Sequence, residues 1–279
     1  MLQGRRGENQ DERVCTILFR LSYTIHFHSD SYYINPYMRN IRLIIAYDGS
    51  SFFGFQIQPN ARTIQGELEM ALSKITKEDI EVVGSGRTDA GVHAINQVVN
   101  FKTNSRIPVD KITIALNSLL PDSIVAKDAR EVPLDFHSRF SAKSRSYIYL
   151  LYTSSYPSPF LRNYAWYLEE KPDIKRMLDI LDIFKGQKDF TSFSRSNGEG
   201  TVREVYDISL INRDPFIIFY VKANGFLRGM VRLIVRVIVD AGYGITGREE
   251  VISILEAKRR GLIKGTAPPG GLYLYNIEY

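Results

Sequence analysis

Hydrophobic and polar residues alternate from Ile41 onward in a regular succession of short strands and amphipathic helices. A period of two predicts strands, and apolar residues three and four apart predict helices that bury one face. The first half gives strands at 41–47, 81–84, 97–102 and 124–130, and helices at 63–76 and 108–119. Pro108 opens the second helix and Pro121 follows its end, as the geometry of proline favours. The predicted order is β-α-β-β-α-β.

The second half repeats this order without obvious sequence similarity. It gives strands at 147–152, 204–211, 216–222 and 272–277, and helices from Pro172 to near Gly186, at 226–240 and at 248–258. The helix that starts at Pro172 is expected to bury Ile174, Met177, Leu178, Leu181 and Phe184. Each half therefore resembles a split β-α-β unit of the ferredoxin-like kind. We predict an α+β fold of two pseudo-repeated halves, with mostly antiparallel sheets flanking a central catalytic cleft.

Residues 1–37 differ from this pattern and are predicted to be a leader. Their apolar stretch from Val14 to Phe27 is interrupted by charge, and no cleavage site follows it, which argues against a signal peptide. The strand pattern starts just after Met38, so we expect Met38 to be the natural start, with a short disordered leader as the alternative. The predicted halves are 38–145, which holds the catalytic loop, and 146–279.

Composition narrows the class of partner. The 36 Lys and Arg against 31 Asp and Glu give a net charge of +5, an excess that attracts polyanions. The 17 Tyr suit base stacking, although half-buried strand positions would account for most of them equally well. Cys15 is the single cysteine, which excludes an intramolecular disulfide and fits a reducing cytoplasm. No apolar run approaches the roughly 18 residues that cross a bilayer, so no membrane partner is expected.

The densest chemical signal is the string GSGRTDAGVHA at residues 84–94, between two predicted strands. A phosphate-binding P-loop is a rival interpretation, but Val92 and His93 follow Gly91 where Lys and Ser or Thr would be needed. The dinucleotide-binding pattern of three glycines fails as well, because Asp89 occupies the third glycine position.

This string resembles the active-site motif of the TruA family of tRNA pseudouridine synthases. Further resemblance, over about residues 39–279, lies in segments that occur in the family's order: AYDGSSFFGFQ at Ala46–Gln56, FHSRFSAKSRSYIY at Phe136–Tyr149, DFTSF at Asp189–Phe193, KANGFLRGMVR at Lys222–Arg232 and GGLYL at Gly270–Leu274. The resemblance implies isomerisation of uridine to pseudouridine at positions 38 to 40 in the anticodon stem-loop of tRNA. It implies no cofactor and no catalytic metal, a homodimer that cradles tRNA across both subunits, and action in the cytoplasm.

The resemblance also implies a role for each matching residue. Asp89 matches the catalytic carboxylate, which acts as a nucleophile or stabilises positive charge at C1′ of the ribose. Tyr147 matches a tyrosine that stacks on the target base and is a candidate for proton transfer. Arg232 matches an arginine that pairs with the carboxylate and keeps it ionised. Arg87 matches an arginine that fills the gap left by the displaced nucleotide, and Leu272 an apolar residue under the target base.

Arg228, Arg232 and Arg236 recur four residues apart, which would place three cations on one helix face. If Arg232 faces Asp89, its neighbours are expected to bind RNA phosphates, although a solvated face is the ordinary alternative. For His93 a structural hydrogen bond is favoured over a metal or catalytic role, because no partner His or Cys lies near it in the sequence.

The chain departs from the family pattern in three places. Gly229 stands where His is usual, at a cost of about 1 kcal/mol if it lies inside a helix. Leu233 replaces a usual Asn and Phe55 a common Trp. Two other functions stay open, namely a non-catalytic RNA-binding module and a related synthase that acts on another RNA. The aromatic sheet signature of common RNA-binding modules is absent from the strands, which weakens the first of these.

Overall fold

A computed structural model describes residues 37–195 and 200–279, so the predicted leader lies outside the described residues except for Tyr37. The first half contains β1 (Arg39–Tyr47), α2 (Ile64–Thr76), β2 (Val82–Gly84), β3 (His93–Thr103), α3 (Val109–Asn117) and β4 (Ile124–Val132). The second half contains β5 (Ser144–Thr153), β6 (Trp166–Leu168), α4 (Ile174–Leu178), β7 (Gly186–Asp189), β8 (Val202–Arg213), β9 (Phe216–Ala223), α5 (Met230–Gly242), α6 (Arg248–Glu256) and β10 (Leu272–Glu278). The predicted α+β class is confirmed.

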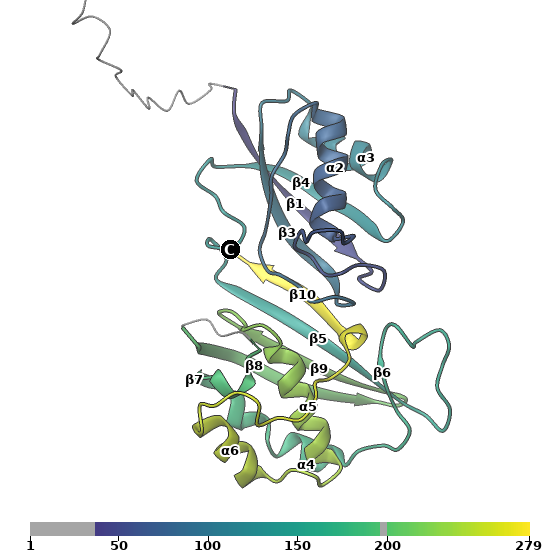
Figure 1. The fold of residues 1–279 in the computed structure, drawn as a ribbon, viewed down its shortest axis with the longest axis vertical. Coiled ribbons are helices and arrows are strands. Elements are labelled where there is room, and N and C mark those ends of the chain that lie inside the picture. The colour runs from purple at the N-terminus through teal and green to yellow at the C-terminus, as the bar shows by residue number, and fades with distance from the viewer. Residues whose placement is uncertain (1–36, 196–199) are drawn as a thin grey trace, which may run out of the picture. The chain divides into compact units, whose positions relative to one another are not determined.

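The two halves share one sheet, where two sheets flanking a cleft were expected. Its strand order is β4-β1-β3-β10-β5-β9-β8-β7, with β2 added to β3 and β6 to β5. The last strand joins the halves, because β10 pairs parallel with β3 and antiparallel with β5 (Figure 1). Leu274 lies opposite both Ala94 of β3 and Tyr147 of β5. The loop that precedes β3 is thereby brought beside β5.

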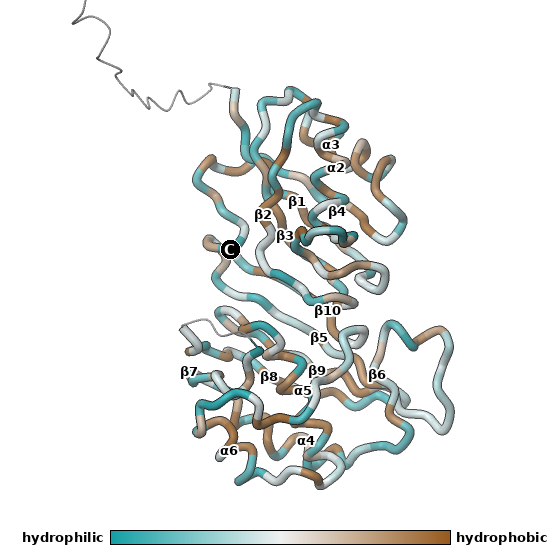
Figure 2. The backbone as a smooth tube through the Cα atoms, viewed as in Figure 1, coloured by the Kyte–Doolittle hydropathy of each residue, from teal (hydrophilic) through white to brown (hydrophobic). Residues whose placement is uncertain are grey.

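The helices α2 and α5 are held in place by buried apolar residues. α2 buries Ile64, Leu68, Ala71 and Leu72, and its N-terminal cap Thr63 accepts a hydrogen bond from the Gly66 amide. α5 is more apolar, and ten of its 13 residues are buried. Figure 2 shows the hydropathy of its residues by colour. A helix apolar on nearly all sides must be covered on nearly all sides. Arg232, Arg236 and Asp240 are the less buried residues of α5 and lie along one side of it.

The predicted helix from Pro172 to Gly186 is wrong in its detail. It is two short pieces, α4 and a 3₁₀ turn at Leu181–Phe184, and Leu178 is 46% exposed instead of buried. Leu181 and Phe184 are buried as predicted, and the tighter 3₁₀ turn also buries Ile183, which was not among the residues expected to be buried. The short strands β6 and β7 were not predicted. They have three and four residues, too few for a period to appear in the sequence.

The start of α5 also corrects a prediction. The helix begins at Met230, four residues later than predicted, because Gly229 at its N-terminal boundary has a left-handed φ of +75°. That conformation suits glycine, so the expected cost of a glycine inside a helix does not arise. Arg228 lies before the helix, and only Arg232 and Arg236 lie on it. The expected stripe of three helical cations is therefore reduced to two.

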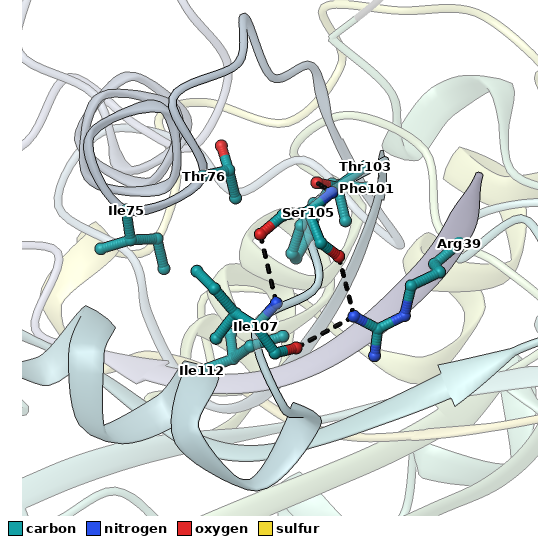
Figure 3. Close-up of a pocket in the computed structure, with 8 residues that line it drawn as sticks. All are labelled: Arg39, Ile75, Thr76, Phe101, Thr103, Ser105, Ile107 and Ile112. Atoms are coloured by element: carbon teal, nitrogen blue, oxygen red, sulfur yellow. Dashed lines mark hydrogen bonds between the residues drawn. The ribbon is translucent and has the colours of Figure 1, made fainter. Parts of the chain in front are cut away.

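An apolar gap in the first half is packing space and not a candidate site. Figure 3 shows its lining, in which the Arg39 guanidinium donates hydrogen bonds of 2.9 Å to the carbonyl oxygens of Ser105 and Ile107. None of its lining residues belongs to residues 84–94. Arg39 instead fastens the segment between β3 and α3 to β1.

Candidate active site

The glycine-rich string forms a tight turn that presents Asp89. It links the end of β2 to the start of β3, and the Val92 amide donates a hydrogen bond of 3.1 Å to the Asp89 carbonyl oxygen. Gly91 has a left-handed φ of +76°, which closes the turn at little cost. The Asp89 side chain is 29% exposed, so its carboxylate is partly buried but still reaches the surface.

The segment Ala46–Gln56 packs against the backbone of this loop. The Phe55 amide donates to the Thr88 carbonyl oxygen at 3.1 Å, and a side chain on Gly54 would lie 2.7 Å from that oxygen. A side chain on Gly49 would lie 2.0 Å from the Val92 carbonyl oxygen. Only glycine leaves enough room at these two positions. The two glycines therefore let this segment support the loop from both ends.

Replacing Gly54 with alanine is expected to displace the Asp89 loop. Its φ of +96° and the 2.7 Å approach to the Thr88 carbonyl oxygen both exclude a side chain, at a combined cost of about 2 kcal/mol or more. Urea unfolding and the rate of the catalysed reaction measure the two effects. Gly247→Ala is the matched control, because Gly247 has an ordinary φ of −93° and open space around it. Equal behaviour of the two variants would contradict this account of Gly54.

Asp89 pairs with Arg232, a residue 143 positions later in the chain. Arg232 Nη1 lies 3.1 Å from Asp89 Oδ2, and the Arg232 side chain is only 12% exposed. Arg232 Nε donates to the Ala267 carbonyl oxygen at 2.8 Å, which fixes the guanidinium plane. Arg228 Nε lies 3.9 Å from the other carboxylate oxygen, although its side chain is 73% exposed. A partly buried arginine in this position forms a charge-assisted hydrogen bond with the carboxylate.

Tyr147 lies on β5 beside the same loop. Its hydroxyl oxygen would be 3.8 Å from a Cβ on Gly86. Its ring contacts the Phe226 ring edge-on, with 5.1 Å between the ring centroids. Burial raises the pKa of Tyr147 to about 12, with the Arg145 charge opposing the rise and the Asp89 charge adding to it. The phenol therefore keeps its proton at neutral pH. Leu272 is buried at the start of β10, opposite Tyr149 of β5.

The remaining candidates have different surroundings. Arg87 is exposed and makes no ion pair with any residue in the two described ranges. Arg228 and Arg236 were both expected to bind RNA phosphates. Arg236 Nε lies 2.8 Å from Asp240 Oδ2, and this ion pair weakens the expectation for Arg236. His93 is buried, and its Nε2 lies 2.9 Å from the Asn163 carbonyl oxygen, an acceptor only. That bond supports a structural role for His93.

Two contacts of the loop were not anticipated from the sequence. The Tyr47 hydroxyl hydrogen-bonds the Thr88 hydroxyl at 2.8 Å, directly beside Asp89, and burial raises the pKa of Tyr47. Arg145 binds the Ser85 carbonyl oxygen. Both residues lie in segments that carried the family resemblance, but in the sequence they look like ordinary strand residues. Their partners are distant in the chain, so no local spacing marked them.

Two findings concern the described residues as a whole. Within residues 37–195 and 200–279, no three or more His, Cys, Asp or Glu side chains are grouped so that they could hold a metal ion. No helix of these two ranges is long and apolar enough to cross a membrane.

Comparison with known proteins identifies the family of this chain. The sequence model of a family described as tRNA pseudouridine synthase matches residues 43–141 and 180–279. The tRNA pseudouridine synthase A of Caldicellulosiruptor bescii is 46% identical over 244 residues, 87% of this chain and all of that protein. That of Acetivibrio thermocellus is 42% identical over the same shares. The chain therefore belongs to the tRNA pseudouridine synthase family and is an isomerase that pseudouridylates tRNA.

Proposed function

We propose that the enzyme modifies uridines at positions 38 to 40 in the anticodon stem-loop, with Asp89 as the catalytic carboxylate. The observation that supports this most is the contact of 3.1 Å between Asp89 and Arg232, beside the buried Tyr147. The reaction breaks the bond between C1′ and N1, turns the base and joins C5 to C1′. N1 gains a proton and C5 loses one, so no atoms enter or leave overall.

Each nearby side chain has a part in this scheme. An ionised Asp89 either attacks C1′ or balances positive charge there, and both roles need the negative charge that Arg232 supports. Tyr147 stacks on the uracil and offers a neutral hydroxyl, since its pKa is about 12. Leu272 packs under the base. Arg87 is exposed and unpaired in the described chain, as a side chain that replaces a displaced nucleotide would have to be.

The position of modification is tested with purified protein and tRNA transcripts. Pseudouridine is mapped after reaction with transcripts that carry uridine at only one of positions 38, 39 and 40, and with one that carries none. We expect product in the first three and none in the fourth. Modification of the fourth transcript elsewhere would overturn the choice of the anticodon stem-loop but leave the isomerase chemistry intact.

The proposal includes a homodimer that acts in the cytoplasm. The first part is supported by the family resemblance and is measured by light scattering on the purified protein at several concentrations. A mass of one chain throughout the concentration range would exclude the dimer. Location is measured by fractionating cells that produce the protein with an epitope tag.

Affinity for tRNA is expected to fall steeply as salt rises, because the net charge is +5 and Arg87 and Arg228 are exposed beside the site. Three phosphate contacts would lower the association constant about 30-fold between 50 and 200 mM salt. Filter binding or fluorescence anisotropy over that range gives the slope. An affinity that does not change with salt would contradict a phosphate-binding surface at this site.

A further inference from the structure

The Arg145 guanidinium holds three separate backbone segments together. Its Nε and Nη2 donate to the Ser85 carbonyl oxygen at 3.0 and 2.8 Å. Nη2 also donates to the Arg139 carbonyl oxygen at 2.6 Å, and Nη1 to that of Asn224 at 3.2 Å. No carboxylate of the described residues forms an ion pair with it. A partly buried cation that binds carbonyl oxygens alone is arranged to fix backbone and not to neutralise charge.

The segments that Arg145 joins are those that carry the proposed site. Ser85 lies four residues before Asp89 in the catalytic loop, and Asn224 lies between β9 and α5, the helix that carries Arg232. Asn224 is itself anchored to β8, because its amide donates to the Glu204 carbonyl oxygen at 3.0 Å and its side chain accepts from the Glu204 amide at 3.1 Å. Arg145 therefore ties the loop of Asp89 to a fixed point on the Arg232 side.

Tyr147 belongs to the same arrangement. It follows Arg145 by two residues on β5, so both side chains leave the same face of the strand. A Cβ on Gly86 would lie 3.8 Å from the Tyr147 hydroxyl oxygen and 4.0 Å from Arg145 Nε. The two side chains thus flank one loop residue. A shift of the loop away from Arg145 would also change its distance from Tyr147.

We propose that Arg145 is a positioning residue for the reaction, which fixes the Asp89 loop against Tyr147 and against the segment that leads to Arg232. The inference rests on the catalytic roles proposed above. The planar guanidinium fork is required, because a lysine ammonium is a single point of charge and cannot reach three carbonyl oxygens in different directions. A misplacement of about 1 Å at a reacting group costs about 100-fold in rate.

Two substitutions test the positioning role. Arg145→Gln removes the charge and most donors, and Arg145→Lys keeps the charge without the fork. In single-turnover reactions with saturating enzyme, Arg145→Gln is expected to lose about 100-fold in rate, while the dissociation constant for tRNA changes by less than about threefold. Arg145→Lys is expected to recover part of the lost rate. If Arg145→Gln does not fold, Arg145→Lys alone is expected to show a lower rate than the wild type with a nearly unchanged dissociation constant for tRNA.

Arg39→Gln is the matched control. Arg39 also binds two backbone carbonyl oxygens, those of Ser105 and Ile107, but in the first half and outside the catalytic loop (Figure 3). Thermal unfolding of both variants reports the loss of stability. We expect similar losses of melting temperature, with the rate of Arg39→Gln unchanged at a temperature where both are folded.

The outcomes separate this inference from the proposed function. A wild-type rate for Arg145→Gln, together with an inactive Asp89→Asn, would overturn the positioning role and leave the catalytic assignment standing. An unchanged rate with greatly weakened tRNA binding would make Arg145 a phosphate ligand and also overturn it. An equal loss of rate in Arg39→Gln would mean that the slower reaction of Arg145→Gln results from a general loss of stability, and would also overturn the positioning role. An active Asp89→Asn would instead remove the proposed function on which the inference rests.

Discussion

Asp89→Asn is expected to lower the rate of pseudouridine formation by about 10⁴-fold or more, as removal of a group that takes part directly in bond cleavage does. Asparagine keeps the size of the side chain but removes the negative charge. It can neither form an adduct at C1′ nor balance positive charge there. The measurement is release of tritium from C5 of labelled uridine in tRNA, run beside a binding assay and thermal unfolding.

Asp128→Asn is the control for this substitution. Asp128 also pairs with an arginine, since Arg42 Nη2 lies 3.2 Å from its Oδ2, but the pair is on β1 and β4, outside the candidate site. We expect Asp128→Asn to keep the wild-type rate and Asp89→Asn to keep tRNA binding and folding. Near-normal tritium release by folded Asp89→Asn would end the proposed mechanism. Loss of folding or binding would mean that Asp89 has a structural role in the turn between β2 and β3.

Arg232→Leu should reduce turnover by about 10²–10³-fold while tRNA binding changes little. Leucine removes the cation 3.1 Å from Asp89 and leaves the Ala267 carbonyl oxygen without its donor. An unsatisfied buried acceptor costs about 1–3 kcal/mol, so some loss of stability is expected as well. Single-turnover rates, dissociation constants and urea unfolding separate the three effects.

A double-mutant cycle with Asp89→Asn shows whether Arg232 acts through Asp89. If it does, Arg232→Leu adds almost nothing in the Asp89→Asn background, because the carboxylate that it supports is already absent. Arg42→Leu is the matched control, as a partly buried arginine paired with an aspartate elsewhere. Independent, multiplying losses from Asp89→Asn and Arg232→Leu would mean that Arg232 contributes to the reaction by another route, such as contact with RNA.

Much of the fold could be predicted, because the period of apolar residues is a local property of the chain. The helix α2 at Ile64–Thr76 and the strand β9 at Phe216–Ala223 agree with the predicted 63–76 and 216–222. The failures occurred where a local pattern competed with packing. Leu178 fits the helical period but is exposed where the chain leaves α4 for a 3₁₀ turn, and Gly229 looked helical but lies just before α5 with a left-handed φ.

In the candidate site, too, some features could be predicted from the sequence and others only from the structure. The glycine-rich string and its family resemblance made Asp89 a candidate from the sequence alone, since special residues crowded into a short loop are themselves a local signal. The contact between Asp89 and Arg232 spans 143 residues, and the bonds of Arg145 reach Ser85 and Asn224, 60 and 79 residues away. Such contacts depend on which strands pair, above all on β10 joining β3 to β5. The local sequence pattern thus determined the order of most helices and strands and the loop that carries Asp89. Which side chains face that carboxylate was decided only by the tertiary structure, because hydrogen bonds and packing between distant segments have no period along the chain.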